Sequence, residues 1–242
     1  MLHDLARVAR AAALDALAIL LPVDCAGCGT PDRGVCELCR ASLAAAPILR
    51  AVGHPPLRVW AGGDYTGVRR RVLLAIKESG RTDAAGSLAP GLASAVSAAL
   101  RDLVHPETVA LCAVPSSRSG RRRRGFDPVR LLAARGGLPL APALRRTRAG
   151  SAQKALGIRD RERNARGSLV APRSLTGRRV LILDDVVTTG ATLLEARRAL
   201  VESGAEVVGA AVCSSTPRVL RTRAGRRADP PTSPGDSPGG EG

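Results

Sequence analysis

Aromatic side chains are nearly missing from this sequence of 242 residues, which contains one Trp, one Tyr and one Phe. Folds that bind RNA or single-stranded DNA stack bases on several aromatic side chains, so the sequence disfavours them. Lysine is also scarce, because only Lys77 and Lys154 occur among 37 basic residues. Hydrophobic residues still make up 45% of the chain, and we therefore expect a folded core of Ala, Val and Leu.

A long hydrophobic run is absent as well. The most apolar stretch near the N-terminus, residues 16–23, is eight residues long, whereas a membrane-spanning helix needs about 20. Asp4 and Asp15 depart from the pattern of a cleaved signal peptide. We therefore expect no membrane insertion and a cytoplasmic location.

Acidic residues are outnumbered, since 21 Asp and Glu oppose 37 Lys and Arg for a formal net charge of +16. Residues 118–179 contain 18 of the basic residues and three of the acids, so most of the excess charge lies in this stretch. Such a concentration indicates a polyanionic partner or substrate. A solvated surface segment in an arginine-rich protein is the alternative interpretation.

The chain divides into segments of different composition. The N-terminal segment has hydrophobic residues at the three- and four-residue spacing of an amphipathic helix, and the C-terminal segment is rich in Arg, Pro, Ser and Gly, which predicts disorder. The predicted units are an N-terminal helix (1–22), a cysteine-rich hairpin with a linker (23–56), an α/β domain (57–216) and a disordered tail (217–242).

Short apolar runs predict the strands of the α/β domain. Strands are expected at residues 57–60, 109–114, 180–183 and 206–213, and a helix at residues 192–203. The last two strands and the helix between them form a strand–helix–strand unit, which implies a parallel sheet with a right-handed crossover. The expected fold is a parallel sheet flanked by helices.

Residues 180–192, Val-Leu-Ile-Leu-Asp-Asp-Val-Val-Thr-Thr-Gly-Ala-Thr, carry the strongest functional signal. An apolar strand is followed by Asp184 and Asp185 and then by a loop of small residues that enters a helix. Ligands bind at this edge of open α/β sheets, and a helix N-terminus favours phosphate. Gly190 allows close approach of the backbone. Carboxylates next to a phosphate site accept hydrogen bonds from a diol, so the motif suits a ribose 5-phosphate.

This string resembles the 5-phosphoribosyl 1-pyrophosphate (PRPP) signature of type I phosphoribosyltransferases. Further segments are similar to the ComF-like branch of that family, which is associated with DNA uptake in competent bacteria. They are Val114-Pro115, residues 121–126, Gln153, residues 161–164 and an N-terminal cysteine cluster.

The resemblance implies a Mg²⁺-dependent transfer of the phosphoribosyl group of PRPP to a nitrogenous acceptor that the sequence does not identify. Asp184 and Asp185 would act as catalytic residues that hold the ribose hydroxyls, with Mg²⁺ bridging pyrophosphate and ribose. The residues expected to bind PRPP are Val187, Thr188, Thr189, Gly190, Ala191, Thr192, Ser116, Ser117, Arg118, Arg124 and Lys77. For Lys77, a solvated position on a helix is an equal alternative.

The chain departs from the family pattern at Asp127-Pro128, where the family usually has Asn-Gln. The change removes amide donors and adds a carboxylate, so acceptor recognition would differ if those amides touch substrate. Gln153, Arg163 and Asn164 either face the ligand or satisfy loop backbone groups.

Cys25, Cys28, Cys36 and Cys39 form two Cys-x-x-Cys pairs separated by seven residues. Four thiolates at this spacing suit a structural Zn²⁺ in one compact hairpin, with no open position for catalysis. A redox pair or two disulfides are the alternatives, which a cytosolic location disfavours. Cys112 and Cys213 lie inside apolar strands and are expected in the core.

Three functions remain open on the sequence. The first is a PRPP-dependent transferase. The second is a non-catalytic accessory protein of competence that contacts DNA or proteins of the uptake machinery through the basic stretch and the zinc hairpin. The third is a thiol–disulfide protein, which would hold no zinc. The sequence does not indicate the oligomeric state.

Overall fold

The structure is a computed structural model that describes residues 23–32, 34–101, 103–147 and 166–217. The predicted N-terminal helix, Gln153, the 161–164 segment and nearly all of the predicted tail lie outside the described residues. Within the described part of the chain, no helix is long and apolar enough to cross a bilayer.

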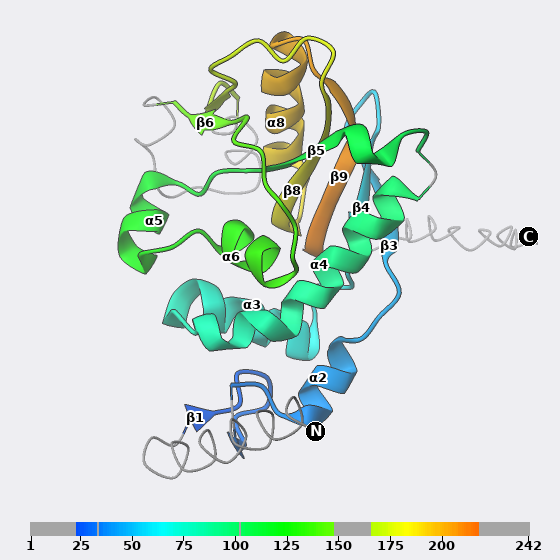
Figure 1. Cartoon of the computed structure of the whole chain (residues 1–242). Helices are drawn as coiled ribbons and strands as arrows, with labels where there is room; N and C mark the ends of the chain where they lie inside the picture. The colour runs from blue at the N-terminus through cyan, green and yellow to red at the C-terminus, as the bar shows by residue number, and fades with distance from the viewer. Residues whose placement is uncertain (1–22, 33, 102, 148–165, 218–242) are drawn as a thin grey trace, which may run out of the picture.

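A five-stranded sheet forms the centre of the molecule (Figure 1). In spatial order its strands are β3 (Ile48–Val52), β4 (Leu57–Ala61), β9 (Glu206–Ser215), β8 (Arg179–Val187) and β5 (Val109–Ala113). The last four strands are parallel to one another, and β3 pairs antiparallel with β4. The central strands are buried on both faces, as expected for a parallel sheet with helices on either side. The predicted fold class is confirmed.

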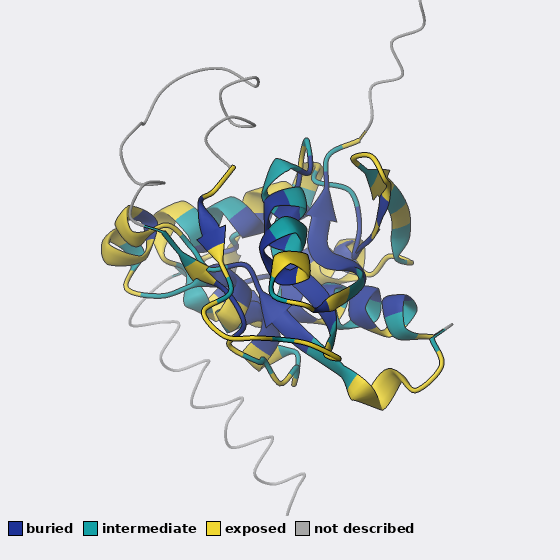
Figure 2. Ribbon diagram, turned by 90° about the horizontal axis from the view of Figure 1, so that it is seen from above, coloured by how far each residue is buried: buried dark blue, intermediate teal, exposed yellow. Residues whose placement is uncertain are grey.

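Helices cover both faces of the sheet. On one face lie α4 (Ala85–Leu100) and α6 (Pro128–Arg135), with α3 (Gly67–Ser79) next to them. On the other face lie α8 (Ala191–Glu202) and a small sheet of β6 (Arg145–Arg146) and β7 (Leu169–Val170). Figure 2 shows the buried strands between helices whose outer faces are exposed. Short elements that complete the domain are η1 (Thr82–Ala84), η2 (Pro106–Thr108) and α5 (Arg118–Arg124).

Strand β8 is longer than its hydrophobic run. The prediction that the strand ends at Leu183, before the two aspartates, is wrong, because β8 continues to Val187. The neighbouring strand β9 continues to Ser215 and keeps pairing with β8, with Asp184 opposite Val212 and Val187 opposite Ser215. The aspartates therefore lie on a paired strand. Because successive side chains of a strand point to opposite faces of the sheet, Asp184 and Asp185 do so as well.

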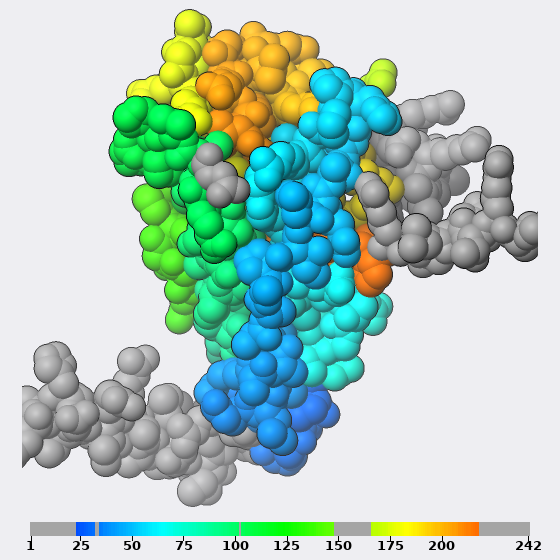
Figure 3. Space-filling view, turned by 90° about the vertical axis from the view of Figure 1, so that its right-hand side faces the viewer, coloured from blue at the N-terminus to red at the C-terminus, as the bar shows by residue number. Residues whose placement is uncertain are grey.

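The segment that carries the four clustered cysteines, residues 23–43 without residue 33, is called here the cysteine module. It contains strands β1 (Val23–Asp24) and β2 (Pro31–Asp32) and helix α2 (Glu37–Leu43). It lies at one end of the molecule, beside α3 (Figures 1 and 3). Only the first cysteine pair is in the hairpin, since Cys36 and Cys39 lie at the start of α2. The expectation of one hairpin for all four is therefore corrected.

The cysteine module shares one hydrophobic core with α3 and α4. Cys25, Cys39 and Leu43 are buried in the same cluster as Leu73 and Ile76 of α3. Hydrogen bonds from arginine side chains to backbone carbonyls of the module also hold it in place.

Arg71 donates from Nε to the carbonyl of Gly27. Arg81 donates to the carbonyls of Asp24 and Gly34 at 3.0 and 3.3 Å. The module is therefore anchored to α3, which carries Lys77, and to the turn that follows it.

Candidate functional site

The two aspartates of β8 meet different cations. Asp185 Oδ1 lies 2.9 Å from Nζ of Lys77, which projects from the last turn of α3. Asp184 lies toward Arg146 of β6, whose positive charge acts on it, and its Oδ1 accepts a hydrogen bond from the backbone N–H of Asp185 at 2.8 Å. Of the two interpretations of Lys77, the structure supports a position at the aspartates, 28% exposed and paired, over a solvated one.

The carboxyl of Asp184 is not an ordinary surface acid. Burial, and then the negative charge of Asp185, raises the pKa of Asp184 to about 8. The N–H of Asp185 and the charges of Lys77 and Arg146 oppose the rise without cancelling it. Near neutral pH Asp184 therefore retains its proton until a cation or hydroxyl donors enter the site.

The loop after β8 leads directly into α8. Gly190 is the N-cap residue of α8, which has 12 residues, and its φ of 85° lies in the left-handed region. A Cβ at this position would lie 2.7 Å from Cβ of Val52, so only glycine fits. Thr189 Oγ1 accepts a hydrogen bond from the N–H of Ala191 at 3.3 Å. Thr188 is exposed and Val187 is buried.

These features leave the first amides of α8 at the open edge of the sheet, where they and the helix dipole can bind a phosphate. The loop adjoins the aspartates because all of these residues lie within nine positions on one continuous strand, turn and helix. The local sequence therefore determines this half of the site.

The end of β5 lies beside the aspartates. Val114 donates its N–H to the carbonyl of Leu183 at 2.9 Å, which holds the following Pro-Ser-Ser-Arg segment alongside β8. Ser117 Oγ accepts from the N–H of Gly120 at 3.1 Å and so caps α5. The hydroxyl of Ser117 thus has a structural role, while Ser116 and Arg118 lie on the same loop.

Asp127 ties this loop to helix α6. One carboxylate oxygen accepts from the N–H groups of Val129 and Arg130 at 3.1 and 3.3 Å, as an N-cap does. The other accepts from the N–H of Ser116 at 2.9 Å. Pro128 is buried at the first position of α6, where proline fits well. The departure from the Asn-Gln pattern therefore has a structural reason in this chain.

The arginines of α5 do not all have the same surroundings. Arg118 and Arg121 to Arg123 are exposed. Arg124 is half-buried and folds back toward Gly120, and its Nε is buried without a hydrogen-bond partner among the described residues. The structure thus places Arg124 against its own helix and leaves the others open to solvent.

Arg146 is a site residue that the sequence prediction missed. Its Nε donates to the carbonyl of Pro115 at 2.8 Å, and its guanidinium interacts electrostatically with Asp184 and Asp127. Burial lowers the pKa of its guanidinium, and the two aspartates oppose this. Within an arginine-rich stretch, nothing in the local sequence distinguishes it from its neighbours.

The four clustered thiols have the geometry of a tetrahedral metal site. Their sulfur atoms lie within 4.8 Å of one another, and Sγ of Cys28 is 3.7 Å from Sγ of Cys36. Zinc bound to thiolates at 2.3 Å separates the sulfurs by about 3.8 Å, so the spacing fits a metal such as zinc. All six cysteines are free thiols, which contradicts the two-disulfide alternative.

Backbone donors around Cys25 favour a thiolate. Its sulfur accepts from the N–H groups of Gly27 at 3.3 Å and Cys36 at 3.2 Å. Burial raises the pKa of Cys25, but these and other N–H donors outweigh burial and lower the pKa to about 6. Burial and the neighbouring sulfurs raise the pKa of Cys39. A bound cation would remove this repulsion between thiolates.

Cys112 and Cys213 are each fully buried in strands of the central sheet, as expected from the sequence. They lie in core clusters separate from each other, and Cys213 packs in the same cluster as the cysteine module.

Known proteins resemble this chain in sequence. The phosphoribosyl transferase domain family matches residues 122–223. The DNA utilization protein YhgH of Escherichia coli strain K12 is 29% identical over 197 residues, 76% of this chain and 85% of that protein. The protein of the same name from Salmonella typhi is 30% identical over 203 residues, 72% of this chain and 87% of that protein.

A shorter match concerns the adenine phosphoribosyltransferase of Nocardia farcinica. It is 63% identical over 38 residues, which is 16% of this chain and 20% of that enzyme. This local likeness is much stronger than the overall one.

Proposed function

The chain belongs to the ComF-like family of type I phosphoribosyltransferases, and from this premise we propose that it binds PRPP with Mg²⁺ and transfers the phosphoribosyl group to a nitrogenous acceptor. One observation carries the proposal. Asp184, Asp185 and the glycine-capped start of α8 follow one another at the end of β8, and Lys77 of α3 pairs with Asp185 there. Among the residues that the structure describes, no other segment combines a phosphate-binding turn with paired carboxylates.

In the proposed complex, the amides from Thr188 to Thr192 bind the 5-phosphate at the start of α8. Asp184 and Asp185 accept hydrogen bonds from the ribose hydroxyls. Arg118 and Arg146 lie on the β5 side of the site and stabilise the pyrophosphate, because guanidinium groups bind phosphate oxygens in pairs.

The reaction breaks the bond between C1 of the ribose and pyrophosphate. Positive charge develops on the ring as this bond lengthens, and the carboxylates of Asp184 and Asp185 stabilise it electrostatically. Lys77 holds Asp185 in place and balances its charge before substrate enters. Oxygen ligands at the aspartates and on PRPP suit Mg²⁺, which when bound neutralises the leaving pyrophosphate.

The cysteine module is proposed to hold one structural zinc through Cys25, Cys28, Cys36 and Cys39. All four positions of the metal are then taken by protein, so the metal has no part in the chemistry. Its contribution is to the fold, since the module and α3 share one core and α3 carries Lys77.

The proposal is tested by calorimetry of PRPP binding with and without Mg²⁺. Asp185→Asn removes the charge at nearly the same shape, and we expect at least a tenfold loss of affinity. Asp83→Asn is the matched control, since Asp83 pairs with Arg81 away from the site. The proposal is refuted if PRPP binds with equal affinity in the presence and absence of Mg²⁺. It is also refuted if Asp185→Asn and Asp83→Asn bind PRPP equally well. Pyrophosphate release across a panel of free bases then tests catalysis.

A second candidate function is binding of DNA by helix α5, within a competence role in the cytoplasm. It rests on the exposed Arg118 and Arg121 to Arg123 and on the relatives named DNA utilization protein. Binding of this kind weakens steeply as salt rises, because counterions are released. Replacing Arg121 to Arg123 by Ser should then reduce DNA affinity and its salt dependence while PRPP affinity persists.

A further inference from the structure

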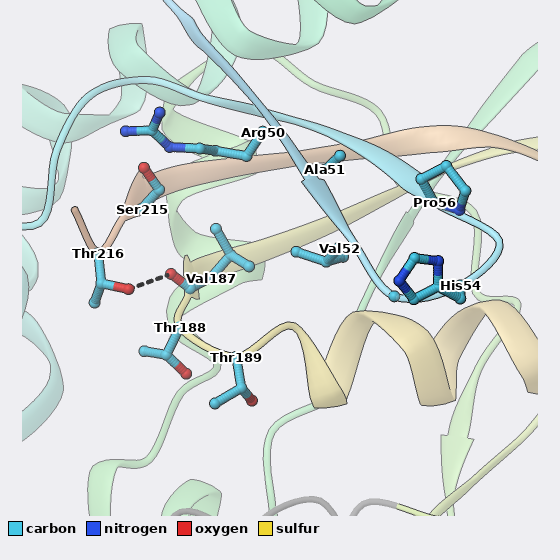
Figure 4. A pocket seen from close by; sticks show the side chains of 11 residues that line it. Arg50, Ala51, Val52, His54, Pro56, Val187, Thr188, Thr189, Ser215 and Thr216 are labelled. Carbon is cyan, nitrogen blue, oxygen red and sulfur yellow. Dashed lines mark hydrogen bonds between the residues drawn. The ribbon is translucent and has the colours of Figure 1, made fainter. Parts of the chain in front are cut away.

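A cavity lies on the side of β8 that faces away from β5. It has a volume of about 360 Å³ and is lined by β3, the turn after β3, the loop after β8 and the end of β9 (Figure 4). Val187, Thr188 and Thr189 line it, so it opens beside the proposed phosphate loop. The cavity is at the small end of the range for ligand pockets, which suits a compact ligand.

The walls of the cavity differ in chemistry. Val52, Pro56 and Val187 make an apolar surface. At one end, Arg50 of β3 and Ser215 of β9 point toward one another (Figure 4). A flat apolar ring with one polar edge matches this arrangement, because the ring meets the apolar walls and its polar edge meets the arginine and the serine.

Two polar atoms at that end have no protein partner. Ser215 is 1% exposed, and its Oγ makes no hydrogen bond within the described part of the chain. The same holds for Nε of Arg50, whose Nη2 lies 3.3 Å from Oδ1 of Asp64. A buried hydroxyl or guanidinium N–H without a partner costs free energy, so each such group calls for an explanation. A ligand oxygen between them would satisfy both.

The order of the strands places this cavity opposite the leaving group. In the order β3-β4-β9-β8-β5, the proposed complex holds the sugar over the end of β8, and the residues proposed for pyrophosphate lie on the β5 side. The cavity lies on the β9 and β3 side. A nucleophile that enters from the cavity therefore approaches C1 from the side away from pyrophosphate, as a displacement at carbon requires.

We propose that this cavity is the acceptor site and that the acceptor is a single-ring nitrogen heterocycle that carries a carboxylate, held at Arg50 and Ser215. The inference rests on the proposed PRPP transfer and names its substrate class. The unpartnered Nε of Arg50 offers a charge-assisted donor to this carboxylate, and the hydroxyl of Ser215 offers a second donor.

Transfer of the phosphoribosyl group to the ring needs no general base when the attacking nitrogen is of the pyridine type. That nitrogen supplies its lone pair to C1 while the electron pair of the C1–O bond leaves with pyrophosphate. It carries no proton, so none has to be removed. The products are the N-ribosyl 5-phosphate of the heterocycle and pyrophosphate.

The test uses three pyridine carboxylates, picolinate, nicotinate and isonicotinate, each paired with its amide. Binding to the full chain with Mg²⁺ and PRPP is measured by saturation-transfer NMR, and pyrophosphate release is followed in parallel. We expect at least one carboxylate to bind and react, and its amide to bind at least tenfold more weakly.

Arg50→Met and Ser215→Ala should each lower affinity for that carboxylate about ten- to a hundredfold, because each removes a donor to a charged group. PRPP affinity should change less than twofold in both variants. Ser215→Ala removes only an unpaired hydroxyl, so the fold is preserved. Arg70→Met, on the exposed side of α3, is the matched control and should have no effect.

Failures of the two proposals are distinguishable. If Mg²⁺-dependent PRPP binding is present but no carboxylate binds, or amides bind equally well, the acceptor assignment is overturned alone. The same holds if Arg50→Met leaves carboxylate affinity unchanged. If PRPP does not bind, the proposed function itself fails. Carboxylate binding that is still observed in that case would identify the cavity as an anion site and not as an acceptor site.

Discussion

Replacement of Gly190 by alanine should destabilise the protein through two separable effects. The residue has φ 85°, and alanine in this left-handed region costs about 1 kcal/mol. The new methyl would also lie 2.7 Å from Cβ and 2.9 Å from both γ-carbons of Val52. Overpacking of this kind costs about 1–3 kcal/mol. We therefore expect a total loss of about 2–4 kcal/mol.

Gly177→Ala is the matched control. Gly177 has φ 73°, but nothing lies within 4 Å of a Cβ built there, so only the conformational cost of about 1 kcal/mol applies. Urea denaturation measures both losses. For a chain of this size, thermal unfolding should show a drop of about 4–16 °C for Gly190→Ala and about 2–4 °C for the control.

A double-mutant cycle isolates the contact with Val52. Val52→Ala removes the γ-carbons that lie at 2.9 Å and keeps the Cβ at 2.7 Å, so it should recover only part, about 1 kcal/mol, of the loss in Gly190→Ala. PRPP affinity should fall in Gly190→Ala and not in Gly177→Ala, because only Gly190 begins α8. Equal losses for the two alanine variants, with no recovery by Val52→Ala, would refute the packing of β3 on this turn.

Three further predictions concern the metal, a cap and a carboxyl. Metal analysis should find one zinc per chain, and its removal by a chelator should lower Tm by about 10 °C, since several kcal/mol of binding free energy are lost; an unchanged Tm would contradict the structural role. Asp127→Ala should cost about 1–3 kcal/mol in urea denaturation, because it leaves the N–H of Ser116 and the first turn of α6 without their acceptor, whereas Asp127→Asn should cost less than about 1 kcal/mol. The raised pKa of Asp184, about 8 against an ordinary value of 3.8, means that the folded protein keeps a proton that the unfolded chain loses above about pH 4. The free energy of unfolding should therefore fall as pH rises from about 4 to 8, and Asp184→Asn should remove that slope; parallel profiles for the two proteins would contradict the assignment.

The sequence by itself was sufficient for features whose parts are close along the chain. The apolar run, the acidic pair and the loop before α8 span 13 residues, so their spacing alone specifies a strand, a turn and a helix start. The two Cys-x-x-Cys pairs specify a four-thiol site for the same reason, and the structure brings all four sulfurs within 4.8 Å. The strand end was misjudged, because pairing with β9 extends β8 past its hydrophobic residues.

Only the tertiary structure decided which distant side chains complete the site. Lys77 is more than a hundred positions from Asp185, and its contact depends on how α3 packs against α4 and the cysteine module. Arg146 and Arg50 are two of many arginines, so composition conceals them until folding places one beside Asp184 and the other beside Ser215. Local patterns report hydrogen bonding and periodicity within a few residues. Contacts between strands far apart along the chain depend on the burial of shared surfaces, which a local pattern does not record.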